Sequence, residues 1–271
     1  SRESGLVFGR PGRSYVKNEI KNLGNQTGYI DKESLPTLGT VSRNENGYPI
    51  GYFFGYKAIG VFQTQEEIDS YISPATGKPI QPNAVPGDTK FEDLNGDGVI
   101  SDDNEDRTMI GKPNPDWMVG LTVAADWNGF DLSAFFQGSF GADVFDALRR
   151  YELAAVNYTS DALERWTGPG TSNSMPRIVL GDTPKNFRPS TLLVHDASFL
   201  RLRNLQVGYT LPAQLTRKAY IQRLRFYASF DNLLTITGYK GMDPEIGSTM
   251  GIDKGVYPQA RVYTFGLNLT F

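Results

Sequence analysis

The end of the chain alternates strictly between two kinds of side chain. Large apolar residues occupy the odd positions and small or polar residues the even ones: Tyr263, Phe265, Leu267, Leu269 and Phe271 against Thr264, Gly266, Asn268 and Thr270. Because successive side chains of a β-strand point to opposite faces, this pattern predicts a strand with one apolar and one polar face. Soluble β-sandwiches also contain alternating strands, so further features must separate a sandwich from a barrel.

The same alternation recurs in four segments upstream. Their apolar positions are Trp117, Val119, Leu121, Val123, Ala125 and Trp127; Phe130, Leu132, Ala134 and Phe136; Leu205, Val207, Tyr209 and Leu211; and Leu224, Phe226, Ala228 and Phe230. Asn128-Gly129 joins the first two segments and is a strong signal for a two-residue hairpin turn. Each segment approaches the roughly ten residues that a tilted strand needs to cross a hydrocarbon layer. Trp117 and Trp127 stand at opposite ends of one strand, where interfacial aromatic girdles lie.

The connections between these segments differ in length. Asn128-Gly129 is very short, whereas 211–222 and 232–259 are longer, and residues 138–198 lack alternation altogether. Short turns on one side and long loops on the other are typical of outer-membrane barrels.

Residues 141–198 are therefore predicted to form one long extracellular loop. Within it we expect one helix near Asp143–Leu153 and another near Asp161–Trp166. A connection of this length is uncommon in a compact soluble domain unless it is functional.

Composition excludes several classes of protein. No run of about 18 apolar residues exists, which rules out a transmembrane helix. A β-barrel needs only one apolar face per strand, so composition does not exclude a membrane location. The net charge of −3 argues against a nucleic-acid partner. Cysteine is absent, which removes disulfides, thiol catalysis and cysteine-based zinc sites.

No constellation of catalytic residues stands out. The chain has 30 Asp and Glu residues, so some carboxylate pairs are inevitable, and no pair is marked as an acid–base couple. His195 is the only histidine, and a general base needs a nucleophile and an orienting partner that the sequence does not identify. We therefore expect a protein that is not an enzyme and holds no organic cofactor.

One loop carries a possible metal site. Asp93, Asn95 and Asp97 alternate before Gly98, like the D-x-N-x-D-G start of an EF-hand calcium loop. The candidate ligands for a structural calcium ion are Asp93, Asn95, Asp97, the carbonyl of Val99, Asp102 and Asp103. Asn104 stands where an EF-hand has its bidentate Glu, and the spacing leaves open whether Asp102, Asp103 or Asp106 replaces it. The alternative is a turn held by Asx side chains without metal.

Two arginines interrupt the apolar pattern of one strand. Arg201 and Arg203 fall on the same face as Phe199, Leu205 and Val207 by simple alternation. We expect both to lie beyond the apolar band, at the level of headgroups or loops.

Five segments together resemble the C-terminal third of SusC/RagA-like TonB-dependent transporters. They are PGDTKFEDLNGDGVISDDNEDRTMIGKPNPDW, FDLSAFFQGSFG, SFLRLRNLQVGYTLP, FYASFDNLLTITGYKGMDPE and YPQARVYTFGLNLTF. They occur in the family's order and cover most of residues 48–271. The aromatic residue Phe271 at the end also resembles the closing strand of bacterial outer-membrane barrels.

The resemblance implies an all-β fold in the bacterial outer membrane. Residues 1–271 would be the C-terminal strands of a 22-stranded antiparallel barrel with long extracellular loops. The plug domain, the TonB box that contacts TonB, and the rest of the barrel are expected outside this chain. The family imports oligosaccharides or peptides, and a SusD-like surface lipoprotein closes over the barrel as a lid.

One alternative belongs to a different class. A soluble carbohydrate-binding β-domain with a calcium-stabilised loop would explain the Asp-rich segment and the loop aromatics. It would not explain the repeated ten-residue strands, the tryptophans at strand ends or the unequal connections.

Overall fold

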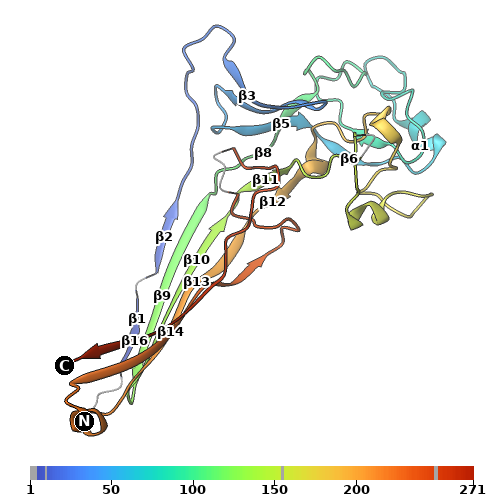
Figure 1. The fold of residues 1–271 in the computed structure, drawn as a ribbon. Helices are drawn as coiled ribbons and strands as arrows, with labels where there is room; N and C mark the ends of the chain where they lie inside the picture. Colours follow the sequence, from blue (N-terminus) through green and yellow to red (C-terminus); the bar gives the residue numbers. More distant parts are fainter. Residues whose placement is uncertain (1–4, 10, 154–155, 247–249) are drawn as a thin grey trace.

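The computed structural model describes residues 5–9, 11–153, 156–246 and 250–271. A long, twisted antiparallel sheet forms one part of the molecule, and small sheets and loops gather beyond one end of it (Figure 1). Strand β1 and the last strand, β16, lie toward the opposite end. We call the long sheet the wall and the gathered loops the head.

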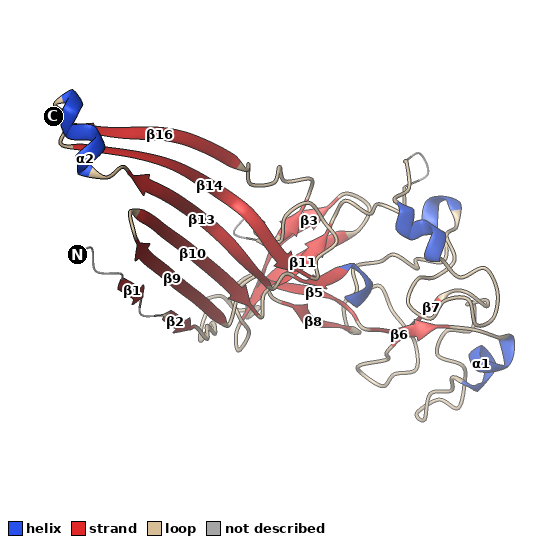
Figure 2. Cartoon of the chain, turned by 90° about the horizontal axis from the view of Figure 1, so that it is seen from below, coloured by secondary structure: helices blue, strands red, loops and turns tan. Residues whose placement is uncertain are grey.

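The wall contains all of the strands predicted from alternation. In order across the sheet they are β1 (Gly5–Phe8) with β2 (Gly12–Tyr15), β9 (Trp117–Trp127), β10 (Phe130–Phe140), β13 (Phe199–Thr210), β14 (Arg223–Thr237) and β16 (Val262–Thr270). Figure 2 shows β9, β10, β13, β14 and β16 side by side. Strands β1 and β2 both pair with β9, in registers that are offset by one residue, so together they line the same edge of the sheet.

Neighbouring strands of the wall place like residues opposite each other. Leu132 pairs with Val207, and Ala228 pairs with Phe265, so apolar side chains gather on one face. That face is open: Trp127 is 66% exposed and Phe265 is 76% exposed. The predicted alternation is confirmed. An apolar face of this extent marks a surface that contacts another apolar medium.

A β-bulge at Arg203 corrects the predicted face of one arginine. Leu202 pairs with Phe136 on β10 while Asn204 pairs with Phe135, which leaves Arg203 as an extra residue. The extra residue reverses the alternation. Arg201 therefore lies opposite Gln137 on the polar face, and not on the apolar face as simple counting predicted.

The ends of the wall differ in how the chain turns. At one end Asn128 and Gly129 have φ of 47° and 92°, as a two-residue type I′ hairpin requires. The connection 211–222 lies at the same end and contains α2 (Ala213–Thr216) and η4 (Arg217–Ala219). The sequence grouped this connection with the long loops, but it belongs to the short-turn side.

The head is built from short elements in three chain segments. Residues 16–116 supply a sheet of β3 (Tyr29–Leu35), β4 (Gly39–Glu45), β5 (Tyr52–Tyr56) and β8 (Arg107–Gly111), a pair of β6 (Ala58–Val61) with β7 (Thr89–Phe91), and α1 (Gln65–Ser70). Residues 141–198 supply β11 (Asp143–Asp146), η1 (Ser160–Glu164), η2 (Leu180–Asp182), η3 (Thr191–Leu193) and β12 (Val194–Asp196). Residues 238–261 supply β15 (Ile252–Asp253).

One of the two predicted loop helices is wrong. The segment expected to form a helix from Asp143 begins instead with strand β11, which pairs with both β12 and β15. These partners lie far along the chain, so tertiary pairing overrides the local pattern. The second helix is confirmed in place as the 3₁₀-helix η1, which ends before Arg165.

A shared apolar core joins the three segments of the head. Phe53, Phe145 and Ile252 each come from a different segment and are almost fully buried in one cluster. The main-chain amide of Phe145 also donates to the carbonyl of Gly251 at 3.0 Å. The head is therefore one packed unit rather than a set of independent loops. No helix within the described ranges is long and apolar enough to cross a membrane.

Candidate functional site

The polar face of the wall carries a paired charge network. Arg225 Nε donates to Asp131 Oδ1 at 2.8 Å, and Nη2 donates to Oδ2, so the pair is bidentate across three strands. The intervening residue is Gly208, and a Cβ there would stand 2.5 Å from Arg225 Nη2 and 2.6 Å from Asp131 Oδ1. The glycine is required because the ion pair lies directly over it.

Other polar groups of this face are also satisfied. Asn204 Nδ2 donates to Ser229 Oγ at 3.0 Å and to Asp231 Oδ1 at 2.7 Å. Toward the short-turn end a cavity of about 880 Å³ opens beside Arg223 and Asn268. A face of fixed, mutually bonded polar side chains can line a water-filled or protein-filled lumen.

An ion-pair cluster ties the head to the wall. Arg201 is 2% exposed and bonds the carboxylates of Asp243 and Glu245, and Arg203 Nη2 contacts Glu245 at 2.6 Å. The predicted level of both arginines, next to the loops, agrees with these contacts. Breaking a buried pair of this kind costs about 3–5 kcal/mol because a charge is left without a partner. The segment 238–261 is therefore firmly attached at the head end of β13.

The Asp-rich loop is folded by its own side chains. Asp93 Oδ1 accepts from Gly96 N at 2.8 Å, and its Oδ2 accepts from Gly98 N at 2.9 Å. Asp97 Oδ1 accepts from Val99 N at 2.8 Å, and Asn95 Nδ2 donates to Asp97 Oδ2 at 3.0 Å. These are the contacts of an Asx-rich turn.

The remaining candidate ligands do not join that cluster. Asp102 contacts Lys185, and Asp103 accepts from Ser101 Oγ. Asp106, buried, accepts from Leu94 N at 3.1 Å and from Ser101 N at 2.9 Å. No group of three or more His, Cys, Asp or Glu side chains within the described part of the chain converges on one point. The calcium ion stays a prediction.

The single histidine lies in an ion-pair cluster. His195 Nε2 is 3.6 Å from Asp146 Oδ2, and Asp146 is also 3.0 Å from Arg149. Arg149 in turn contacts Asp161 at 2.6 Å. These contacts link β12 to the end of β11 and to the segment with Arg149 and Asp161 that follows β11.

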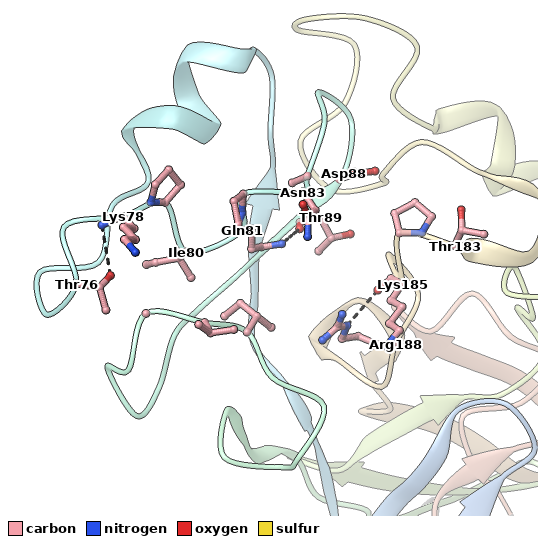
Figure 3. Close-up of a pocket in the computed structure, with 17 residues that line it drawn as sticks. Thr76, Lys78, Ile80, Gln81, Asn83, Asp88, Thr89, Thr183, Lys185 and Arg188 are labelled. Atoms are coloured by element: carbon pink, nitrogen blue, oxygen red, sulfur yellow. Dashed lines mark hydrogen bonds between the residues drawn. The ribbon is translucent and has the colours of Figure 1, made fainter.

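A depression opens on the head near its far end. It encloses about 710 Å³ and is walled by the turn that contains Lys78, by Asp88 and by the 183–188 segment (Figure 3). Asp88 does not present a free charge to it, because its carboxylate accepts from Arg177 and Asn186. Sequence reasoning did not identify this depression, since its walls come from segments about 100 residues apart.

Known proteins resemble the whole chain. No protein-family model matches it. TonB-dependent receptor P3 of Formosa agariphila is 34% identical over 236 residues, which are 83% of this chain and 22% of that protein. TonB-dependent receptor SusC of Bacteroides thetaiotaomicron is 30% identical, over 94% of this chain and 23% of its own length. A chain of the RagAB peptide transporter superposes with a TM-score of 0.73 at 26% identity, over 100% of this chain and 28% of its own.

The chain belongs to the SusC/RagA-like TonB-dependent receptors. It spans about a quarter of the length of the relatives it matches. TonB-dependent receptors are outer-membrane proteins. The family consists of transporters and not of enzymes, which agrees with the prediction of a non-enzymatic protein.

Family membership also clarifies the fold. The chain is mostly β and matches part of the barrel of a solved SusC/RagA-like receptor. The alternative interpretation of the sequence, a soluble carbohydrate-binding domain, is wrong, because this family resides in the outer membrane.

Proposed function

We propose that the complete protein imports an oligosaccharide or peptide nutrient across the bacterial outer membrane, energised by TonB. The observation that carries this proposal is the superposition of both wall and head, over the full chain, on a chain of the RagAB peptide transporter. The wall supplies a polar face for the transport pathway, and the head supplies rigid loops around its mouth. Selectivity then resides in the head and in the polar face.

The wall requires partner strands on both edges. In the described part of the chain, β16 pairs only with β14, and the edge formed by β1 and β2 pairs only with β9. Unpaired backbone groups cost several kcal/mol each inside a bilayer, so an open sheet edge is not tolerated there. We infer that residues outside this chain close the barrel to 22 strands and that a plug domain fills its lumen.

The head faces the outside of the cell in this proposal. Residues 141–198 then belong to an extracellular loop, and the connections 128–129 and 211–222 face the periplasm, where outer-membrane barrels usually have their shorter connections. A SusD-like surface lipoprotein would close over the head as a lid. The RagAB match supports such a two-protein assembly.

Uptake assays test the import function. The source bacterium with the complete gene deleted should lose uptake of one labelled oligosaccharide or peptide mixture, and a plasmid copy should restore it. Deletion of TonB in the otherwise intact strain should abolish the same uptake. Uptake that persists without TonB would contradict active import and favour a passive pore.

A further inference from the structure

A second depression in the head differs from the first in its charges. It lies between the β3–β4 turn, the Asp-rich loop and the segment 181–189, and encloses about 640 Å³. Small-molecule sites usually measure about 300–1,000 Å³. We call it the arginine pocket. Its charged lining residues are Asp102, Arg107, Glu152, Asp182, Lys185 and Arg188.

Unpartnered polar atoms concentrate around this pocket. Among the described residues, five buried side-chain nitrogen or oxygen atoms have no hydrogen-bond partner. Three of them belong to its lining, namely Arg107 Nε, Glu152 Oε2 and Arg188 Nη1, and a fourth, Ser190 Oγ, follows the lining residue Pro189. Buried groups of this kind are rare and each needs an explanation. Their concentration points to a polar ligand that supplies the missing partners.

The cations of the pocket outnumber the carboxylates that neutralise them. Lys185 contacts Asp102, and Arg188 Nη1 is 3.7 Å from the same carboxylate, beyond hydrogen-bond distance. Arg107 forms no ion pair within the described ranges and bonds main-chain carbonyls and Asn104 instead. Three cations therefore share one carboxylate.

The other two acids of the lining are already engaged. Glu152 Oε1 is bonded by Arg150, and the Asp182 carboxylate accepts the amides of Asn186 and Phe187 at 2.9 and 2.8 Å. Within the described ranges neither acid forms an ion pair with Arg107, Lys185 or Arg188.

Aromatic rings hold the two arginines in place. The Arg107 guanidinium lies 4.3 Å from the ring centre of Phe54, and that of Arg188 lies 4.7 Å from Tyr56 and 5.0 Å from Phe91. A cation–π contact fixes a guanidinium without neutralising it. Both arginines are thus positioned and still carry charge for an anion, and an arginine can bond a carboxylate through two parallel hydrogen bonds.

The unpartnered acceptor adds a second requirement. Glu152 Oε2 needs a hydrogen-bond donor, which a carboxylate ligand does not itself provide but a hydroxyl does. We propose that the arginine pocket binds a small ligand in which a carboxylate stands beside hydroxyl groups, as in a uronic acid. The carboxylate contacts Arg107, Arg188 and Lys185, and a hydroxyl donates to Glu152.

Calorimetry on the complete, detergent-purified receptor tests the site with three probes. Glucuronate carries both groups, glutarate carries only carboxylates, and glucose carries only hydroxyls. Glucuronate should bind about tenfold more tightly than either of the others, since a charge-assisted hydrogen bond and a neutral one each add affinity. Equal binding of glucose and glucuronate would overturn the site, and so would glutarate binding as tightly as glucuronate.

Matched variants locate the binding. Lys185→Gln alters a half-exposed side chain and should weaken the binding of glucuronate about tenfold. Lys78 lines only the neighbouring depression, so Lys78→Gln should leave the affinity for glucuronate unchanged. Equal affinities in the two variants would refute the assignment. Binding needs neither TonB nor a lid, so a receptor that imports nutrients but ignores glucuronate refutes this site and leaves the proposed import intact.

Discussion

The wall and the head use opposite strategies to become stable. The wall has long strands paired with their neighbours, and leaves large apolar side chains open on one face, such as Phe265 at 76% exposure. The head has short strands and buries its apolar side chains, such as Phe53 and Phe145, in an inner core. In the proposed barrel the wall therefore depends on lipid as its apolar partner, whereas the head depends on its own core. Changes to one part should leave the other largely unaffected.

The largest effect is expected in the core of the head. Phe53→Ala removes a fully buried ring that contacts Phe145 at 5.9 Å between ring centres. Such truncations cost about 3–5 kcal/mol. Limited proteolysis of the purified receptor should then cut the head, while the receptor still inserts into the membrane. Loss of insertion as well would show that the two parts are not separable.

The next effect concerns the lipid face of the wall. Leu267→Arg places a charge on that face and should cost about 2–4 kcal/mol near the bilayer midplane. The control is Thr264→Arg, on the polar face opposite Ser229. Outer-membrane fractionation should show a strong loss of assembled receptor for the first variant only. Equal damage from both would mean that the assigned faces are wrong.

A pH effect is expected in the head alone. Burial raises the pKa of Asp182 to about 6, with the nearby Glu152 adding to the shift while two amides and Arg188 oppose it. Because the pKa of Asp182 is higher in the folded than in the unfolded protein, the folded head is most stable with Asp182 protonated. This stabilisation is full below about pH 4 and is lost as the pH rises through about 6. Proteolysis of the head should be slower at pH 5.5 than at pH 7.5. The Asp182→Asn variant should show a smaller difference in proteolysis rate between the two pH values. An unchanged difference would mean that another titratable group causes the pH effect.

The smallest effect tests the predicted calcium ion. Asp97 takes part in the turn around Gly98 through Val99 and Asn95. If calcium is bound, a chelator should speed proteolytic cleavage within residues 91–107 of the native receptor. The Asp97→Ala variant should be cleaved rapidly in this loop with or without chelator. Identical cleavage of the native receptor with and without chelator would mean that the Asx-rich turn holds the loop without calcium.

Alternation was sufficient to predict the five long strands of the wall because its signal is local. The wall strands β9, β10, β13, β14 and β16 were readable from a period of two, and the Asn128-Gly129 turn from two residues. The bulge at Arg203 was not readable, since counting along a strand assumes that no residue is extra. That single residue decides that Arg201 faces the polar side.

The head was not predictable in the same way. Strand β11 is only four residues long and pairs with Ile252, more than 100 residues further on, so nothing local separates it from a helix. The charge balance of the arginine pocket is likewise a tertiary property. In the sequence Arg107 and Arg188 resemble ordinary surface arginines. Only the structure shows that their guanidinium groups pack against aromatic rings and are not neutralised by hydrogen-bonded carboxylates among the described residues.

The central claim is that the wall is part of an outer-membrane barrel. Fractionation of the source bacterium, followed by gel electrophoresis in detergent with and without boiling, tests it most directly. The account predicts that the receptor appears in the outer membrane and changes mobility on boiling, because a closed barrel resists detergent until heated. A receptor in the soluble fraction whose mobility does not change would contradict the account.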